Sequence, residues 1–406
     1  MIAVNYHDDL NEVQADAALY GLLTAPARTA PFDRLEWWQA LASDCGISPV
    51  LASARRAGDM AVLPLARTDG GMVALANWYS FFTRPVVSKG ANGLALLTAL
   101  ARNLRGQTGR ITLAPMPDEG GEASLVAQAF KAAGWLVTME ECDTNHIIHL
   151  GGQSYAQYLA ARPGQLRTTL KRKAKKVAIT LHDRFTDQGW ADYEAIYAKS
   201  WKPEEGSPAF LKRFAQEEGR AGRLRLAVAH AEIEGVNQPV AAQLWTVEGG
   251  TAYIHKLAYI EPAKPLSPGT SLSAALFERV IDGDGVARVD FGTGDDPYKR
   301  DWMESQRPRY RIVIHRSTAP AQWPAIAKAA VAFVDDHRNR PHRLDGGQHA
   351  LQVGFGGADP FGAEIFQRHP RQTGFFQERL DDEGFARAHG ANGQQSHRGQ
   401  GGVAFF

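Results

Sequence analysis

The segment from Val240 to Lys299 carries side chains whose types and spacing could do chemistry. It holds His255 on a predicted strand, a Ser-Pro-Gly-Thr-Ser sequence at residues 267–271, and an acidic, glycine-rich stretch, DFGTGDDPYK, at residues 290–299. Histidine and carboxylates accept protons in enzymes, whereas tyrosine and lysine can donate them. The segment therefore combines candidate acid–base groups with a candidate helix start.

The helix start has the features of a phosphate site. The N–H groups of a first helical turn point outward, and the helix dipole makes that end positive. A glycine lets the backbone come close to a ligand, and neighbouring hydroxyls add donors. The candidate cofactor-binding residues here are Ser267, Pro268, Gly269, Thr270 and Ser271. The same residues also make a good generic helix cap, so the local sequence leaves both interpretations open.

The acidic stretch follows a short predicted strand. It would place Asp290 and Asp295, with the Tyr298–Lys299 pair, beside a pocket at a strand end. A turn rich in glycine and aspartate is the alternative. Asp-Phe-Gly also occurs in protein kinases, but the other kinase motifs are missing, which excludes that family.

The elements that must position these groups alternate between helix and strand. In the first unit, residues 32–41, 94–104 and 123–133 have helical spacing, and residues 50–54, 60–66, 110–113 and 135–139 are predicted strands. In the second unit, helices are predicted at 155–161, 166–178, 190–200, 209–218 and 270–280, and strands at 179–182, 224–229, 240–247, 251–259, 288–291 and 310–315. A Glu-Gly-Gly turn at 248–250 makes two of these strands a hairpin. The pattern predicts an α/β fold with a central sheet.

Length and composition favour two or three domains of a globular protein. The chain has 406 residues, 44% hydrophobic, with a formal net charge of +1, which argues against a stable nucleic-acid complex. Two isolated cysteines favour neither a disulfide scaffold nor a metal site. We see no signal-peptide pattern and no apolar run of about 18 residues. We therefore expect a cytoplasmic protein without a membrane span.

Composition also predicts the domain boundaries. We expect an N-terminal domain at residues 1–150, a second domain at 151–335 that ends in a helix at 323–334, and a disordered low-complexity tail at 336–406. The tail is rich in Gly, Gln, His and Arg and lacks apolar periodicity, so we place no function there.

The order of these motifs resembles a known family. A hairpin, a Ser-Pro-Gly helix, the DFGTGDDPYK stretch and Trp302 follow one another as in the GNAT-like acetyltransferase domain of CelD-like and Fem-like proteins. The basic segment LRTTLKRK at 166–173 is similar to that domain's entry helix. The resemblance covers residues 155–300. It implies tandem GNAT-like folds with a mixed, mostly antiparallel sheet flanked by helices, residues 1–150 being the degenerate partner.

The resemblance also implies a reaction, in which an amine attacks the thioester carbonyl of an acyl-CoA donor, acetyl-CoA or longer. Backbone N–H groups around Leu257 would polarise that carbonyl, and Lys299 would help to hold the donor. Asp290 and Asp295 are the candidate bases and His255 a weaker one, since a strand histidine is more often structural. Tyr298 could protonate the leaving thiolate. The family's usual Arg/Gln-x-x-Gly-x-Gly/Ala signature is reduced here to Ser-Pro-Gly-Thr-Ser.

The basic helix does not by itself identify a binding partner. Six cationic side chains lie within residues 166–176, which is either a solvated face or a cradle for an anionic ligand, an acyl carrier protein, a tRNA or a lipid-linked acceptor. The leading hypothesis is an N-acyltransferase acting on the amine of a small-molecule or envelope-precursor acceptor, including a lipid-linked amine. The alternatives are a Fem-type aminoacyl transferase using aminoacyl-tRNA and a non-catalytic GNAT-like module in polysaccharide biosynthesis.

Overall fold

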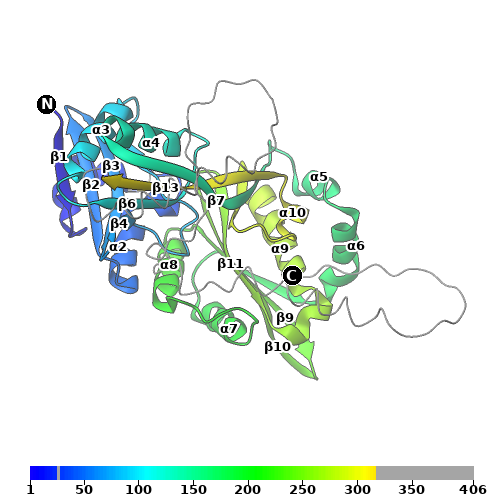
Figure 1. Cartoon of the computed structure of the whole chain (residues 1–406). Coiled ribbons are helices and arrows are strands. Elements are labelled where there is room, and N and C mark those ends of the chain that lie inside the picture. The colour runs from blue at the N-terminus through cyan, green and yellow to red at the C-terminus, as the bar shows by residue number, and fades with distance from the viewer. Residues whose placement is uncertain (25–27, 317–406) are drawn as a thin grey trace, which may run out of the picture.

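A computed structural model describes residues 1–24 and 28–316 of the chain. The predicted helix at 323–334 and the predicted tail at 336–406 lie outside the described residues, as does the end of the predicted second domain. Within the described part, helices flank a single long, open sheet (Figure 1).

The first half of the chain builds one end of this sheet. Its strands are β1 (Ala3–His7), β2 (Pro49–Arg56), β3 (Asp59–Thr68), β4 (Gly71–Ala74), β5 (Val86–Val87), β6 (Arg110–Met116) and β7 (Trp135–His149). Its helices are α1 (Ala17–Leu23), α2 (Leu35–Cys45), α3 (Gly93–Leu104) and α4 (Glu122–Ala132). The apolar stripes of α3 and α4 pack with β2, β3 and β6 into one buried cluster, as their helical spacing predicts.

The second half builds the other end. Its strands are β8 (Ala178–His182), β9 (Leu224–Ile233), β10 (Val236–Glu248), β11 (Thr251–Tyr259), β12 (Arg288–Thr293) and β13 (Ser305–Arg316). Its helices are α5 (Tyr155–Ala160), α6 (Gly164–Lys173), α7 (Asp187–Ala198), α8 (Pro208–Arg220), α9 (Pro268–Glu278) and α10 (Lys299–Trp302). A π-helical turn, Arg279–Gly283, follows α9. Gly249 and Gly250 turn β10 into β11 with positive φ angles of 55° and 70°, as the predicted hairpin requires.

The two halves repeat one topology and exchange their last strands. In each half, a helix links two parallel strands: α3 follows β4 and leads to β6, and α9 follows β11 and leads to β12. The strand order is β1-β2-β3-β4-β6-β13-β7-β12-β11-β10-β9-β8, and the other ladders are antiparallel. Thus β13, from the end of the second half, lies between β6 and β7, and β7 pairs with β12. The predicted mixed, mostly antiparallel sheet flanked by helices is confirmed.

Contacts of β10 and β11 show which helix covers which face of the sheet in the second half. Gln243 on β10 donates to the carbonyl of Gly269 in α9 at 3.0 Å. Its neighbour Leu244 pairs with Lys256 on β11, whose ammonium lies 5.4 Å from the ring centroid of Tyr197 in α7. Because adjacent residues of a strand point to opposite faces, α9 covers one face of the sheet and α7 covers the other.

A buried charge network joins the halves below this sheet. Arg34, at the start of α2, bonds Glu218 of α8 at 2.8 Å and lies 3.5 Å from Glu248 of β10. Arg223 also bonds Glu218, at 2.7 Å. Burial raises the pKa of Glu248 to about 7, since the nearby Arg34 offsets only part of the desolvation. One carboxylate oxygen of Glu248 has no hydrogen bond within the described chain.

Glu248→Gln should therefore stabilise the protein at neutral and alkaline pH. A carboxyl group whose pKa is higher in the folded state than in the unfolded state stabilises the fold at pH values below its unfolded-state pKa. That contribution is lost as the pH rises through its folded-state pKa. We expect the variant to gain about 1–3 kcal/mol in free energy of unfolding at pH 8, shrinking as the pH falls towards 5. Urea unfolding at both pH values measures this. Glu232→Gln, at an exposed position of β9, is the control; equal effects of both variants would contradict the prediction.

Candidate active site

The parallel strands β11 and β12 pair only at one end and then separate. Their register joins Thr251, Ala252 and Tyr253 to Arg288, Val289 and Asp290. Beyond these pairs, a cavity of about 460 Å³ opens between the strands. Its wall includes the four β11 residues and the three β12 residues that follow the paired region, namely Ile254, His255, Lys256, Leu257, Phe291, Gly292 and Thr293.

The register of β11 changes where the cavity begins. Leu244 of β10 pairs with Lys256, but the next residue, Trp245, pairs with Ile254. His255 is therefore the extra residue of a β-bulge. A bulge re-aims the backbone and side chains next to it, so N–H groups near Lys256 can face the cavity instead of the neighbouring strand.

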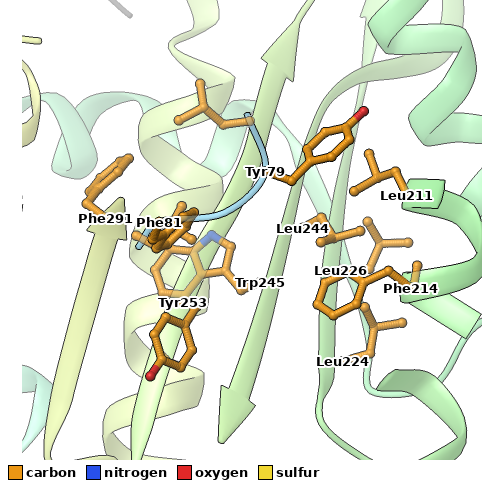
Figure 2. Packing of buried hydrophobic residues seen from close by; sticks show 14 of the residues in the cluster. Tyr79, Phe81, Leu211, Phe214, Leu224, Leu226, Leu244, Trp245, Tyr253 and Phe291 are labelled. Carbon is orange, nitrogen blue, oxygen red and sulfur yellow. The ribbon is translucent and has the colours of Figure 1, made fainter. Parts of the chain in front are cut away.

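The first half of the chain supplies the opposite wall. The segment after β4 brings Trp78, Tyr79 and Phe81 to the cavity. Figure 2 shows Phe81 beside Phe291 and Tyr253, and Tyr79 on the same loop near Leu211 of α8. A side-chain carbon on Gly292 would lie 3.1 Å from the Phe81 ring, closer than an ordinary contact, and the φ of +68° favours glycine as well. The cavity is thus completed by residues from both halves.

One buried carboxylate organises the aromatic side of the cavity. Glu205, between α7 and α8, accepts hydrogen bonds from Lys256 at 2.9 Å and from the hydroxyls of Tyr79 and Tyr193. The Lys256 ammonium also lies 4.7 Å from the Tyr79 ring centroid. Burial lowers the pKa of Lys256, and Glu205 opposes that shift. The pair fixes the α7–α8 loop against β11 and the first half.

Tyr298 and Lys299, both predicted site residues, line the cavity. The Lys299 ammonium donates to the carbonyls of Thr293 and Gly294, at 2.5 and 3.0 Å, and lies 3.7 Å from Asp296. It therefore ties the acidic loop together at the end of β12. The Tyr298 ring packs edge-on against Phe291, and burial raises the pKa of its hydroxyl far above the ordinary value, so the phenol stays protonated.

Asp290 lies in a buried network and is not among the residues lining the cavity. Its carboxylate accepts from Asn145 at 2.7 Å, from the Gly292 N–H at 2.9 Å and from Arg307 at 2.8 Å. These bonds join β12 to β7 and β13 at the point where the last strands are exchanged. The geometry therefore favours a role in holding the turn of β12.

Asp295, the other predicted base, also lies outside the cavity wall. It bonds Arg300 at 2.6 Å and His146 at 2.9 Å, and its side chain is half-exposed. Its neighbour Asp296 is the carboxylate of this loop that lines the cavity, together with Asp143 of β7. Sequence reasoning reached a loop that lines the cavity but could not distinguish which of its two adjacent aspartates does so.

His255 lines the cavity but is enclosed by aromatic rings. Its ring centroid is 5.0 Å from that of Phe214 and 5.3 Å from that of Phe81, and its Nε2 lies 2.8 Å from the Thr246 hydroxyl. Burial lowers its pKa to about 3. A neutral imidazole with so low a pKa is a weak base, so this environment favours a structural role for His255.

The predicted helix start is where the sequence placed it, and it is closely packed. Ser267 caps α9 in a left-handed conformation, with φ of 51°. The residues from Ser267 to Ser271 are buried. Lys173, at the end of the basic helix α6, donates to the Ser267 hydroxyl at 3.0 Å. The structure thus brings the basic segment and the helix start together, which the sequence analysis had treated as separate features.

Comparison with known proteins identifies this arrangement. The family described as "Acetyltransferase (GNAT) domain" matches residues 157–300, from α5 to the start of α10. Residues 157–300 thus match a GNAT acetyltransferase domain. The GNAT match includes the separating strands, the bulge, the α9 start and the acidic loop. A GNAT domain implies an acyl-CoA donor in general. A search of curated proteins finds no match.

Solved structures share the fold at low sequence identity. FemX aligns with a TM-score of 0.55 at 12% identity, over 79% of this chain and 99% of FemX. L-PGS from Bacillus licheniformis aligns at 0.49 and 12%, over 79% and 95% of the two chains. A tandem GNAT protein from the clavulanic acid biosynthesis pathway aligns at 0.48 and 13%, over 79% and 100%. The similarity to FemX supports a Fem-like fold, as predicted.

The predicted site residues fall into three places. His255, Leu257, Tyr298 and Lys299 line the cavity, residues 267–271 start α9, and Asp290 and Asp295 lie in hydrogen-bond networks beside the cavity. Their catalytic and binding roles stay predictions. The sequence analysis missed Tyr79, Asp143 and Lys202, which distant segments contribute, and the side chain of Lys256, with Glu205 behind them. Within the described chain, no helix has the length and apolar character needed to cross a membrane.

Proposed function

We propose that the protein transfers an acyl group from acyl-CoA to the amine of a small-molecule or envelope-precursor acceptor. One observation carries the proposal: β11 and β12 separate around a cavity that both strands line. Such a separation lets a thioester reach strand backbone N–H groups that are not used in the sheet. Residues from both halves close the cavity, which would hold the donor's reactive end and the acceptor amine together.

The α9 start is the proposed site for the donor's phosphates. Its backbone N–H groups and the hydroxyls of Ser267, Thr270 and Ser271 are suited to a phosphate, and Lys173 adds a positive charge at Ser267. A short 3₁₀ helix, Glu261–Leu266, connects this helix to β11, whose Leu257 lines the cavity. A donor held at both points would therefore follow the end of β11.

The cavity offers groups for each proton transfer. We assign the polarisation of the thioester carbonyl to backbone N–H groups near Leu257, beyond the bulge. We assign to Asp296, in the cavity wall, the role of accepting a proton from the attacking amine. The amine nitrogen forms a bond to the carbonyl carbon, and the carbon–sulfur bond then breaks. Tyr298, which lines the cavity, would donate its proton to the departing thiolate.

Titration calorimetry with acetyl-CoA and longer acyl-CoAs tests the donor. We expect binding with a Kd of about 1–100 µM, near the range of enzyme KM values. Lys173→Met should weaken binding about five- to tenfold, because it removes one charge-assisted contact at the phosphate site. Lys199→Met, at the exposed end of α7, should leave the Kd unchanged. If no acyl-CoA binds, the donor assignment is wrong.

A second candidate is Fem-type aminoacyl transfer from aminoacyl-tRNA. It is favoured by the Fem-like fold and by the exposed cations of α6 and the following turn, Lys171, Arg172, Lys175 and Lys176. Gel-shift with charged tRNA distinguishes it, because binding to a phosphate backbone weakens steeply as salt rises. No shift at low salt would remove this candidate.

A further inference from the structure

The loop between α7 and α8, residues 199–207, brings one lysine into the cavity wall. Lys202 lines the cavity and is partly buried, and its ammonium lies 5.5 Å from the ring centroid of Trp201. Its backbone N–H donates to the Ser200 hydroxyl at 3.3 Å. Neither the predicted motifs nor the proposed reaction uses this side chain.

The loop that carries Lys202 is held on both sides. Glu205 anchors it to Lys256 and to the hydroxyls of Tyr79 and Tyr193. Gly206 lies so close to Trp78 that a side-chain carbon there would be 2.2 Å from the indole. Gly206 therefore packs directly against the Trp78 ring of the first half. Lys202 is therefore positioned by the fold, unlike a lysine at a free loop tip.

The carboxylates around Lys202 are committed to other partners. Glu205 pairs with Lys256 at 2.9 Å, and Asp296 lies 3.7 Å from the Lys299 ammonium. Across residues 1–24 and 28–316, the Lys202 ammonium has neither a hydrogen bond nor an ion pair. Burial and the like charge of Lys256 lower its pKa to about 8. A partly buried ammonium without a counterion is unfavourable, and a bound anion would offset that cost.

The position of the Lys202 loop relative to the sheet indicates which substrate carries the anionic group. Lys202 follows α7, which covers the face of the sheet opposite to α9. The proposed phosphate site for the donor is at the start of α9. On the proposed function the donor's phosphates bind at the start of α9, so we assign an anion bound at the α7 side of the cavity to another source. That leaves the acceptor as its source.

We propose that Lys202 is a specificity residue that binds an anionic group, phosphate or carboxylate, on the amine acceptor. This rests on the proposed acyl transfer, because that reaction is what makes the second substrate an amine. Lys202 would act on binding of the acceptor, not on proton transfer, so it should affect KM more than kcat.

Matched amine pairs test the proposal. Calorimetry compares glucosamine 6-phosphate with glucosamine, and alanine with alaninamide, so that the two arms separate phosphate from carboxylate; KM and kcat with acetyl-CoA are measured for any pair that is acetylated. For at least one pair, the wild type should bind the anionic member about tenfold or more tightly. Lys202→Met should abolish that preference, and Lys202→Arg should retain most of it. Lys199→Met, three residues earlier and exposed, is the matched control.

Two results would overturn the inference: no preference for the anionic member of either pair, or a preference that persists in Lys202→Met. Acetyl-CoA titrated separately keeps this result distinct from the proposed function. Acetyl-CoA binding without anion preference removes only the role of Lys202. An anion preference that depends on Lys202, without acetyl-CoA binding, removes the donor assignment and leaves the anion site in place.

Discussion

Tyr298→Phe is expected to lower kcat for acetyl transfer by about 10²- to 10³-fold, the usual range for loss of a positioned general acid. Tyr298 lines the cavity, and burial keeps its hydroxyl protonated at neutral pH. Phenylalanine preserves the edge-on packing against Phe291 and removes only the proton donor. The KM for acetyl-CoA should change little, because the loss falls on the step in which the thiolate departs.

Release of the coenzyme thiol, followed with a thiol reagent, gives both kinetic constants. The control is Tyr155→Phe, which removes the hydroxyl of another largely buried tyrosine, on α5, that does not line the cavity. It should leave kcat within about twofold of the wild type, since a change away from the reacting groups has little effect on the barrier. If Tyr298→Phe behaves like this control, Tyr298 is not the proton donor.

Asp290→Ala is expected to destabilise the fold by about 3–5 kcal/mol, the cost of breaking a buried ion pair from one side. The carboxylate is buried and accepts from Asn145, the Gly292 N–H and Arg307, at 2.7, 2.9 and 2.8 Å. Its removal leaves a guanidinium and an amide without this partner where β7, β12 and β13 meet. Urea unfolding monitored by tryptophan fluorescence measures the loss.

Asp295→Ala provides the comparison. Asp295 is half-exposed, and its pairing with Arg300 is a surface ion pair, so we expect a change below about 1 kcal/mol. Together the two variants distinguish a structural role of Asp290 from a catalytic one. If Asp290→Ala unfolds at the wild-type urea concentration but loses transfer activity, Asp290 acts as the base and the structural interpretation is wrong.

Local sequence patterns predicted most elements of the fold. Helical spacing found α3 and α4 within a residue or two, and the Glu-Gly-Gly turn placed the β10–β11 hairpin correctly. The short strands β1, β4 and β5 escaped detection, because they contain too few residues to show a period. The predicted strand at 135–139 is in fact the first third of β7. Its polar remainder pairs with β13 and β12, and such long-range pairing leaves no local signal.

The site was predictable only where its residues are close in sequence. The helix start at Ser267 and the Tyr298–Lys299 pair could be found because each motif is contiguous. The Glu205–Lys256 pair and the Tyr79 hydroxyl come together through loops from different halves, and their spacing in the chain carries no signature. The networks around Asp290 and Asp295 were hidden for the same reason, since their partners Asn145 and His146 lie on β7.

Hydrogen–deuterium exchange with and without acetyl-CoA tests most directly where the donor binds. Amides in the cavity-lining part of β11 and at the start of α9 should exchange more slowly in the complex, because the ligand would hydrogen-bond or cover them. We predict protection at residues 254–260 and 267–271, with little change in β2 and β3. Binding that leaves both segments unprotected, or protects only the first half of the chain, would contradict the proposed site.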